Sequence, residues 1–197
     1  MSTLTLGILK SNVRKWTTNC SNNGQLVINK VLFIGFLLSF LTACNRQDKA
    51  NRPSPFTSDT LNLNGHTLSI AYSSPRVRGR AIWDDLVPYH KVWRTGANEA
   101  TVFQTDVSLR IEGQLLPAGK YSLFTIPTED SWTIIFNREW NQWGAYSYDS
   151  TKDQVRVAVK PNRQREFKEE MTFELREDSI LFQWRNLGYE LVYETLD

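Results

Sequence analysis

From about residue 60 to the carboxyl terminus, apolar residues recur at every second position in short runs. Side chains of a β-strand alternate between its two faces, so this pattern predicts strands that bury one face. No stretch of this region carries a convincing helical repeat. The sequence therefore predicts an all-β domain.

About nine strands are expected, with turn residues between them. Asn64-Gly65 separates the run at 61–63 from the run at 68–72 and predicts a tight hairpin, because both turn positions accept a positive φ. The remaining runs lie at 102–106, 107–111, 121–126, 132–136, 155–159, 171–175, 180–184 and 189–193. This spacing is typical of a two-sheet sandwich or a closed barrel, and we favour a jelly-roll-like antiparallel β-sandwich.

Residues 73–100 interrupt the alternation with a segment rich in Arg, Asp, Trp and Gly. A loop of 28 residues is usually either functional or disordered. Trp83, Tyr89, Val92 and Trp93 argue against disorder. We therefore expect one long ordered loop.

The amino-terminal region has a different character. Residues 31–43 are apolar apart from Ser39 and Thr42, and they follow Lys30. A helix of this length covers about 20 Å, too little for a bilayer core of roughly 30 Å but suited to a secretory signal peptide. We expect residues 1–43 to be a signal peptide with an upstream extension, the true start lying near Leu26 or Val27. Residues 44–59 then form a flexible tether and residues 60–197 the folded domain.

Leu41-Thr42-Ala43-Cys44 resembles the box of bacterial lipoproteins, in which the chain is cleaved before a cysteine that carries lipid. The resemblance implies several acyl chains on Cys44, enough for stable attachment to a membrane. Asn45 follows the cysteine, rather than the Asp associated in some bacteria with inner-membrane retention. We expect a cell-envelope protein, anchored at the outer membrane or on the periplasmic face.

The distribution of charge argues against a nucleic-acid partner. Four of the 23 Lys and Arg residues precede Cys44, which leaves 19 against 21 Asp and Glu in the rest of the chain. These charges are interspersed, whereas a polyanion requires a concentrated basic face. The chain after Cys44 contains no further cysteine, so core burial must stabilise the domain without disulfides.

Several longer motifs are similar to those of a known family. They are 74–80 (SPRVRGR), 86–101 (LVPYHKVWRTGANEAT), 116–123 (LPAGKYSL) and 141–146 (NQWGAY). On these motifs the chain from about residue 60 to 197 resembles the domain-of-unknown-function family number twenty-nine eleven, which is common in Bacteroidetes. The resemblance implies a secreted fold and adds no catalytic residue, and the family usually has Gly where this chain has His90.

Six residues are candidates for a ligand-binding site: Trp93, Arg94, Asn98, Glu99, Trp143 and Tyr146. The stretch from Arg94 to Glu99 offers a guanidinium, a hydroxyl, an amide and a carboxylate, which can grip a sugar or a carboxylate. Trp143 and Tyr146 belong to a group of aromatic residues in the irregular segments that can stack on sugar rings. The competing interpretation is structural: Arg94 and Glu99 pair with each other or cap strand ends in a buried loop, and the rings pack in the core.

The sequence gives little support for a catalytic, metal-binding or phosphate-binding site. His90 with Asp84, Asp85 or Glu99 could form an acid–base pair or hold a metal, but no HExxH spacing is present. Neither a GxSxG elbow nor a Gly-rich phosphate loop occurs, so we expect no metal, no cofactor and no catalytic residue. We predict a non-enzymatic binder of a small polar or carbohydrate ligand. An envelope hydrolase and a scaffold component of an envelope complex are the alternatives.

Overall fold

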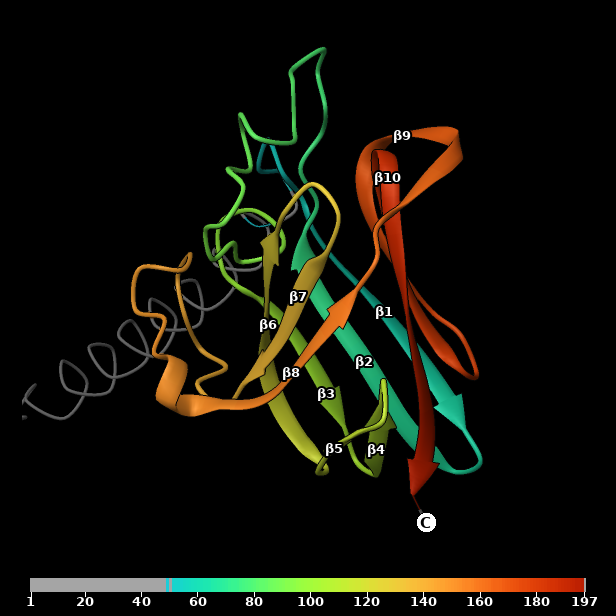
Figure 1. Ribbon diagram of the computed structural model, residues 1–197. Helices are drawn as coiled ribbons and strands as arrows, with labels where there is room; N and C mark the ends of the chain where they lie inside the picture. Colours follow the sequence, from blue (N-terminus) through green and yellow to red (C-terminus); the bar gives the residue numbers. More distant parts are fainter. Residues whose placement is uncertain (1–48, 50, 197) are drawn as a thin grey trace, which may run out of the picture. The chain divides into compact units, whose positions relative to one another are not determined.

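The computed structural model describes Lys49 and residues 51–196. Within these residues it contains ten β-strands in two antiparallel sheets and one short 3-10 helix, η1 (Ser150–Lys152) (Figure 1). The predicted all-β, two-sheet sandwich is therefore confirmed. Cys44 and the predicted signal peptide lie outside the described residues.

The larger sheet has six strands. In spatial order they are β1 (Phe56–Leu63), β2 (His66–Ser73), β3 (Thr101–Thr105), β6 (Gly119–Pro127), β7 (Trp132–Asn137) and β8 (Asp153–Val159). The smaller sheet has four strands: β5 (Gln114–Leu116), β4 (Ser108–Ile111), β10 (Ser179–Leu196) and β9 (Asn162–Leu175). In the described part of the chain, no helix is long and apolar enough to cross a membrane.

The hairpin expected at Asn64-Gly65 is present. Both turn residues have a positive φ, 53° and 88°, and β1 pairs with β2 along its whole length. β1 begins at Phe56, so regular structure starts before residue 60, where we expected the domain to begin.

The second sheet departs from the expected strands in two places. The runs at 180–184 and 189–193 are one strand, β10, interrupted by register shifts around Arg185, whose φ is 57°. β5 and the first half of β9 were not expected, because β5 has only three residues and the residues at 162–170 are mostly exposed. Backbone pairing holds these segments in the sheet where the apolar pattern is too weak to reveal them.

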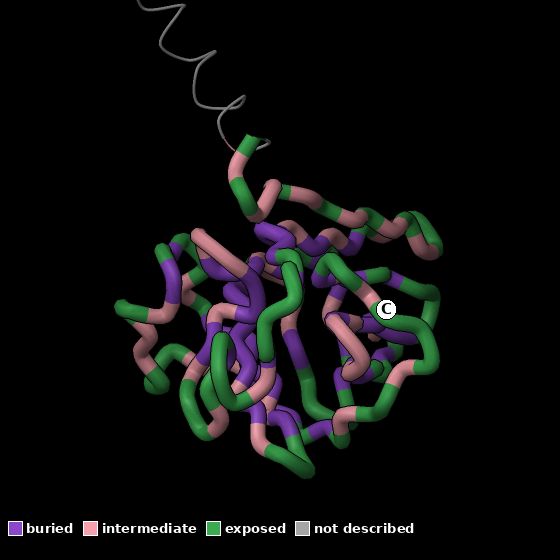
Figure 2. Tube along the Cα trace, turned by 90° about the horizontal axis from the view of Figure 1, so that it is seen from above, coloured by how far each residue is buried: buried purple, intermediate pink, exposed green. Residues whose placement is uncertain are grey.

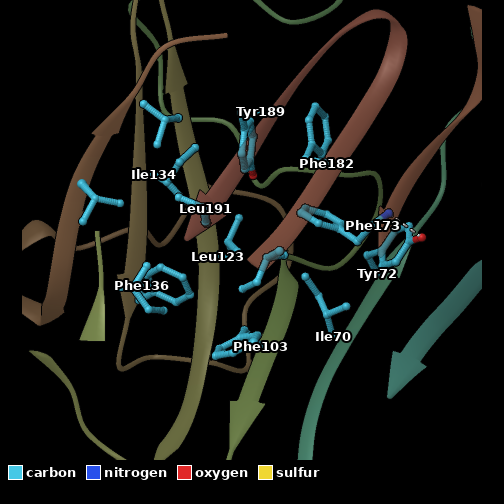
Figure 3. Close-up of a cluster of buried hydrophobic side chains, with 14 of the residues drawn as sticks. Ile70, Tyr72, Phe103, Leu123, Ile134, Phe136, Phe173, Phe182, Tyr189 and Leu191 are labelled. Atoms are coloured by element: carbon cyan, nitrogen blue, oxygen red, sulfur yellow. Dashed lines mark hydrogen bonds between the residues drawn. The ribbon is translucent and has the colours of Figure 1, made fainter. Parts of the chain in front are cut away.

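The core lies between the two sheets. Figure 3 shows Phe103, Leu123 and Phe136 from the larger sheet facing Phe182 and Leu191 from the smaller one. The rings of Phe182 and Tyr189 stack with centroids 4.8 Å apart, an arrangement that adds stability beyond burial alone. Seen from above in Figure 2, the buried segments lie in the interior and most exposed residues on the outer loops.

The long loop after β2 is ordered, as expected. Trp93 and Thr125 exchange two backbone hydrogen bonds of 2.8 Å, and the Ala97 N–H donates to the Ser73 carbonyl at 3.1 Å. The Trp93 ring stacks on Trp184 with centroids 5.9 Å apart. The loop is therefore attached to β6 at Thr125 and to the aromatic core.

Candidate functional site

Two irregular segments meet over the outer face of the larger sheet. The Ala100 N–H donates to the Gln142 carbonyl and the Gly144 N–H to the Asn98 carbonyl, both at 3.0 Å. Ala100 also packs with Phe124 and Ile135 in a second buried cluster on that face. The end of the long loop and the 137–149 segment are therefore joined to each other and to the sheet.

Beside this junction lies a cavity of about 240 Å³, which we call the sheet-face cavity. Its floor is formed by outward-facing residues of three neighbouring strands, whose inward-facing neighbours are in the core: Ser69 and Ala71 of β2, Val102 and Gln104 of β3, and Lys120 of β6. Ser69 pairs with Gln104, and Gln104 pairs with Lys120, so these three form one row across the sheet. Because the side chains of Ser69 and Ala71 are small, they leave space above the sheet at this point.

The rim is formed by Phe56 at the start of β1 and by side chains from outside the sheet. The rim residues are Lys49, Phe56, Glu99, Trp140, Asn141 and Gln142. Trp140 is 42% exposed, and the Lys120 ammonium lies 3.7 Å from the centroid of its ring. The cavity thus has an aromatic wall with a cation against one face.

Gln142 contributes an acceptor that has no donor. Its Nε2 donates to the Glu139 carbonyl at 2.6 Å, which fixes the orientation of the amide. Its Oε1 is then buried, with no hydrogen-bond partner in the described part of the chain. Buried polar atoms of this kind are uncommon in folded proteins, and an absent ligand or water is one explanation.

Glu99 is held by two cations from the segment before β1. Arg52 Nη1 lies 3.0 Å and 2.9 Å from the two carboxylate oxygens, and Lys49 Nζ lies 3.1 Å from Oε1. Burial alone would raise the pKa of the Glu99 carboxyl, but a backbone hydrogen bond together with Arg52 and Lys49 lowers that pKa below its usual value. The carboxylate is therefore charged and neutralised at neutral pH.

A second cavity, of about 230 Å³, lies beside residues 93–97 of the long loop. We call it the loop cavity. Trp93, Arg94, Gly96 and Ala97 line it, together with Trp184 of β10. A Cβ on Gly96 would lie 3.1 Å from Thr101 Oγ1 and 3.2 Å from the Ser73 carbonyl, so the backbone there leaves little space for a side chain. Residues from 93 to 97 thus line the loop cavity, whereas Glu99 and Ala100 line the sheet-face cavity.

The six predicted site residues do not line a single cavity in the structure. Trp93 is buried, donates its indole N–H to the Gly96 carbonyl at 3.1 Å, and lines the loop cavity with Arg94. Glu99 lines the sheet-face cavity and forms an isolated bridge with Trp143. The expected alternative pairing of Arg94 with Glu99 is wrong, because Glu99 binds Arg52 and Lys49 instead.

The other predicted residues lie at the surface near the junction. Asn98 Nδ2 donates to the Ser54 carbonyl at 3.4 Å. Trp143 is 57% exposed and lies 5.8 Å from the Arg52 guanidinium, and Tyr146 is 87% exposed. Their role in binding remains a prediction.

Sequence reasoning did not identify Lys49, Gln104, Lys120 or Gln142 as site residues. Gln104 and Lys120 are polar positions within alternating runs, which marks them only as outward-facing. Their alignment in one row depends on strand register, which a single sequence does not provide. Lys49 lies in the segment expected to be a tether.

The residues of the hydrolase alternative are dispersed. His90 Nε2 lies 3.8 Å from Glu129 Oε2, with both side chains more than 60% exposed. Asp84 and Asp85 are also exposed, and Glu99 is engaged with Arg52. Across Lys49 and residues 51–196, no group of three or more His, Cys, Asp or Glu residues could hold a metal ion.

Comparison with protein families places the chain in a family. Neither the curated proteins nor the solved structures contain a match to the chain. The family model described as "Protein of unknown function (DUF2911)" matches residues 54–192, which include all ten strands of the sandwich apart from the last residues of β10. The chain therefore belongs to the DUF2911 family.

Proposed function

We propose that the protein is a lipid-anchored cell-envelope protein that binds a small, neutral, polyhydroxylated ligand, such as a short saccharide, in the sheet-face cavity. The observation that carries this proposal is the partly exposed ring of Trp140, which lines the cavity together with the amide side chains of Asn141 and Gln142. Sugar hydroxyls donate as well as accept, and sugar rings pack against aromatic side chains.

The polar groups around the cavity match such a ligand. Gln104, Asn141 and Gln142 supply amides that both donate and accept. Ligand pockets for larger molecules are typically about 300–1,000 Å³, so a cavity of about 240 Å³ fits a ligand of one or two sugar units.

The charges around the cavity favour a neutral ligand. Lys49 is already paired with Glu99, and the Lys120 ammonium lies over the π face of Trp140. A cation that has a partner gains less from a ligand anion, because the existing contact must be lost or shared. Neutral hydroxyls can bind without displacing either contact.

The proposal is tested with an array of neutral oligosaccharides, probed with the full-length protein in a non-glycosidic detergent. At least one neutral saccharide should bind, and Trp140→Ala should reduce its affinity by ~10-fold or more. Trp143→Ala is the matched control, because Trp143 is more exposed and does not line the cavity. Absence of binding to every saccharide, or equal losses in both variants, would contradict the proposal.

A lipid anchor at Cys44 would limit the distance between the sheet-face cavity and the membrane. Lys49, on the rim, is five residues after Cys44. An extended chain covers at most ~3.5 Å per residue, so the rim would lie within about 17 Å of the lipidated residue. The ligand would therefore be at or near the membrane surface.

The anchor is tested by fractionation and mass spectrometry. The mature protein should sediment with membranes, and its amino-terminal peptide should begin at an acylated Cys44. Cys44→Ser should leave the protein unprocessed and without the acyl chains. A soluble protein with an unmodified cysteine at this position would exclude lipid anchoring.

A further inference from the structure

We propose that the loop cavity is a second binding site, which takes a small organic carboxylate. This proposal is independent of saccharide binding, since the two cavities share no lining residue. It depends on two arginines that have no carboxylate partner among the described residues and on the absence of Asp and Glu from the residues that line the cavity.

Arg94 is the central donor. Its side chain is half-buried, and Nε is fully buried with no hydrogen-bond acceptor in the described part of the chain. Burial lowers the pKa of the Arg94 guanidinium, a direction that reflects the cost of holding this cation away from water. A bound anion at the accessible Nη groups of the guanidinium would offset that cost.

Trp184 and Arg80 also line the cavity, Trp184 as a buried neighbour and Arg80 as a second cation. Trp184 is 1% exposed, and its indole N–H is also buried without an acceptor among the described residues. Arg80 donates Nε to the Val77 carbonyl at 3.1 Å and Nη2 to the Arg76 carbonyl at 2.5 Å. Both acceptors are neutral, so the charge of Arg80 is not neutralised by these contacts.

The loop cavity has two arginines and no carboxylate in its wall, whereas several other arginines are paired with acidic side chains. Arg52, Arg76 and Arg176 each contact a carboxylate of the protein. The residues that line the loop cavity include two arginines and no Asp or Glu. The site therefore offers positive charge and N–H donors to an anion from outside the chain.

The apolar part of the wall identifies the kind of anion. Leu86 is 43% exposed and lines the cavity together with Ala97, which gives the wall an apolar part. Inorganic phosphate would leave this surface without a partner, whereas an organic acid places its carboxylate at the arginines and its body against Leu86. At about 230 Å³, the cavity suits a compact acid such as a short-chain or aromatic monocarboxylate.

The indole N–H resonance of Trp184 gives a direct readout in the ¹⁵N spectrum of the full-length protein. Benzoate and butyrate are the carboxylate probes, benzamide is the neutral isostere of benzoate, and inorganic phosphate tests charge alone. We expect a saturable shift of the Trp184 signal with at least one carboxylate and none with benzamide. No shift with either acid, or an equal response to benzamide or phosphate, would overturn the proposal.

Arg94→Met separates ligand binding from a structural role, because it replaces the cation with an apolar chain of similar length. Without ligand, the variant should melt at the wild-type temperature or above it, since a buried cation without a partner does not stabilise the fold. The increase in Tm that benzoate gives the wild type should be lost. Arg110→Met, on β4 and paired with Glu194, should keep that increase.

A lower Tm of Arg94→Met without ligand, together with an unchanged response to benzoate, would assign Arg94 to the fold alone and contradict the proposal. Failure of this site is distinguishable from failure of the saccharide site. Trp140→Ala should leave the benzoate response intact, and Arg94→Met should leave saccharide binding intact.

Discussion

At the scale of single residues, Glu99 connects the segment before β1 to the end of the long loop. Its carboxylate accepts hydrogen bonds from Arg52 and Lys49, and all three side chains are partly buried. The pair is therefore more than a surface contact but remains accessible to solvent. Its contribution should be modest and dependent on pH.

Glu99→Gln should lower the free energy of unfolding by about 1 kcal/mol at pH 7. Because the pKa of Glu99 is lower in the folded state, its contribution is complete above the unfolded-state pKa of about 4.3 and is lost as the pH falls through the folded-state pKa. Urea unfolding of wild type and variant should therefore converge in acid. Glu166→Gln, at an exposed pair with Lys168, is the control and should change little at either pH. A difference that persists unchanged at pH 3 would contradict this account of Glu99.

Trp93→Ala should destabilise the protein by about 3–5 kcal/mol, because the ring stacks on Trp184 inside the core. Trp143→Ala should cost no more than ~0.5 kcal/mol, since Trp143 is largely exposed. Thermal unfolding of the two variants makes the comparison. Equal losses would show that the loop is not packed as described.

Composition and spacing alone could not separate these two tryptophans. Both lie in irregular segments rich in polar residues, where stacking on a ligand and packing in the core leave the same sequence signal. Only the pairing of Trp93 with Thr125 of β6 places one ring inside the sandwich. For the same reason Arg94 and Glu99, five positions apart, were grouped in one site although they face different cavities.

At the scale of elements, the long loop behaves as an extension of the sheet. The amides of Trp93 and Ala97 donate to carbonyls of β6 and β2, and the Thr101 N–H donates to the Arg94 carbonyl at 3.2 Å. The loop therefore lines two cavities with a fixed backbone, although no β-strand is formed between β2 and β3.

Hydrogen exchange should reveal this attachment. The amides of Trp93, Ala97 and Ala100 should exchange slowly, at rates close to those of β3, because each has a backbone acceptor in a packed region. The exposed turn at Thr128–Ser131 is the reference for fast exchange. If residues 93–100 exchange as fast as that turn, the loop does not hold a preformed site.

Strand pattern was predictable wherever one face is buried and the other exposed. β2 and β3 keep a buried residue at every second position, and the Asn64-Gly65 turn fixes the first hairpin. β9 and β10 were harder, because they form a long hairpin whose outer half buries few side chains. Arg185 to Gly188 resembles a turn in sequence but forms a bulged part of β10.

For the molecule as a whole, two cavities of similar volume have opposite chemistry. The sheet-face cavity combines amides with paired charges, whereas the residues that line the loop cavity include two arginines and no Asp or Glu. The segment before β1 borders both, with Lys49 at the first and Ser54 at the second. Lipid at Cys44 would hold both cavities close to a membrane.

The central claim is that a neutral saccharide binds beside Trp140 on the outer face of the larger sheet. The most direct measurement is ¹⁹F NMR of the full-length protein labelled with 5-fluorotryptophan, with Trp140 assigned by Trp140→Phe and the tightest-binding saccharide of the array as the titrant. The account predicts a saturable shift of the Trp140 signal while the buried Trp132 and Trp184 signals stay in place. A titration that leaves Trp140 unchanged, or that moves only Trp143, would contradict it.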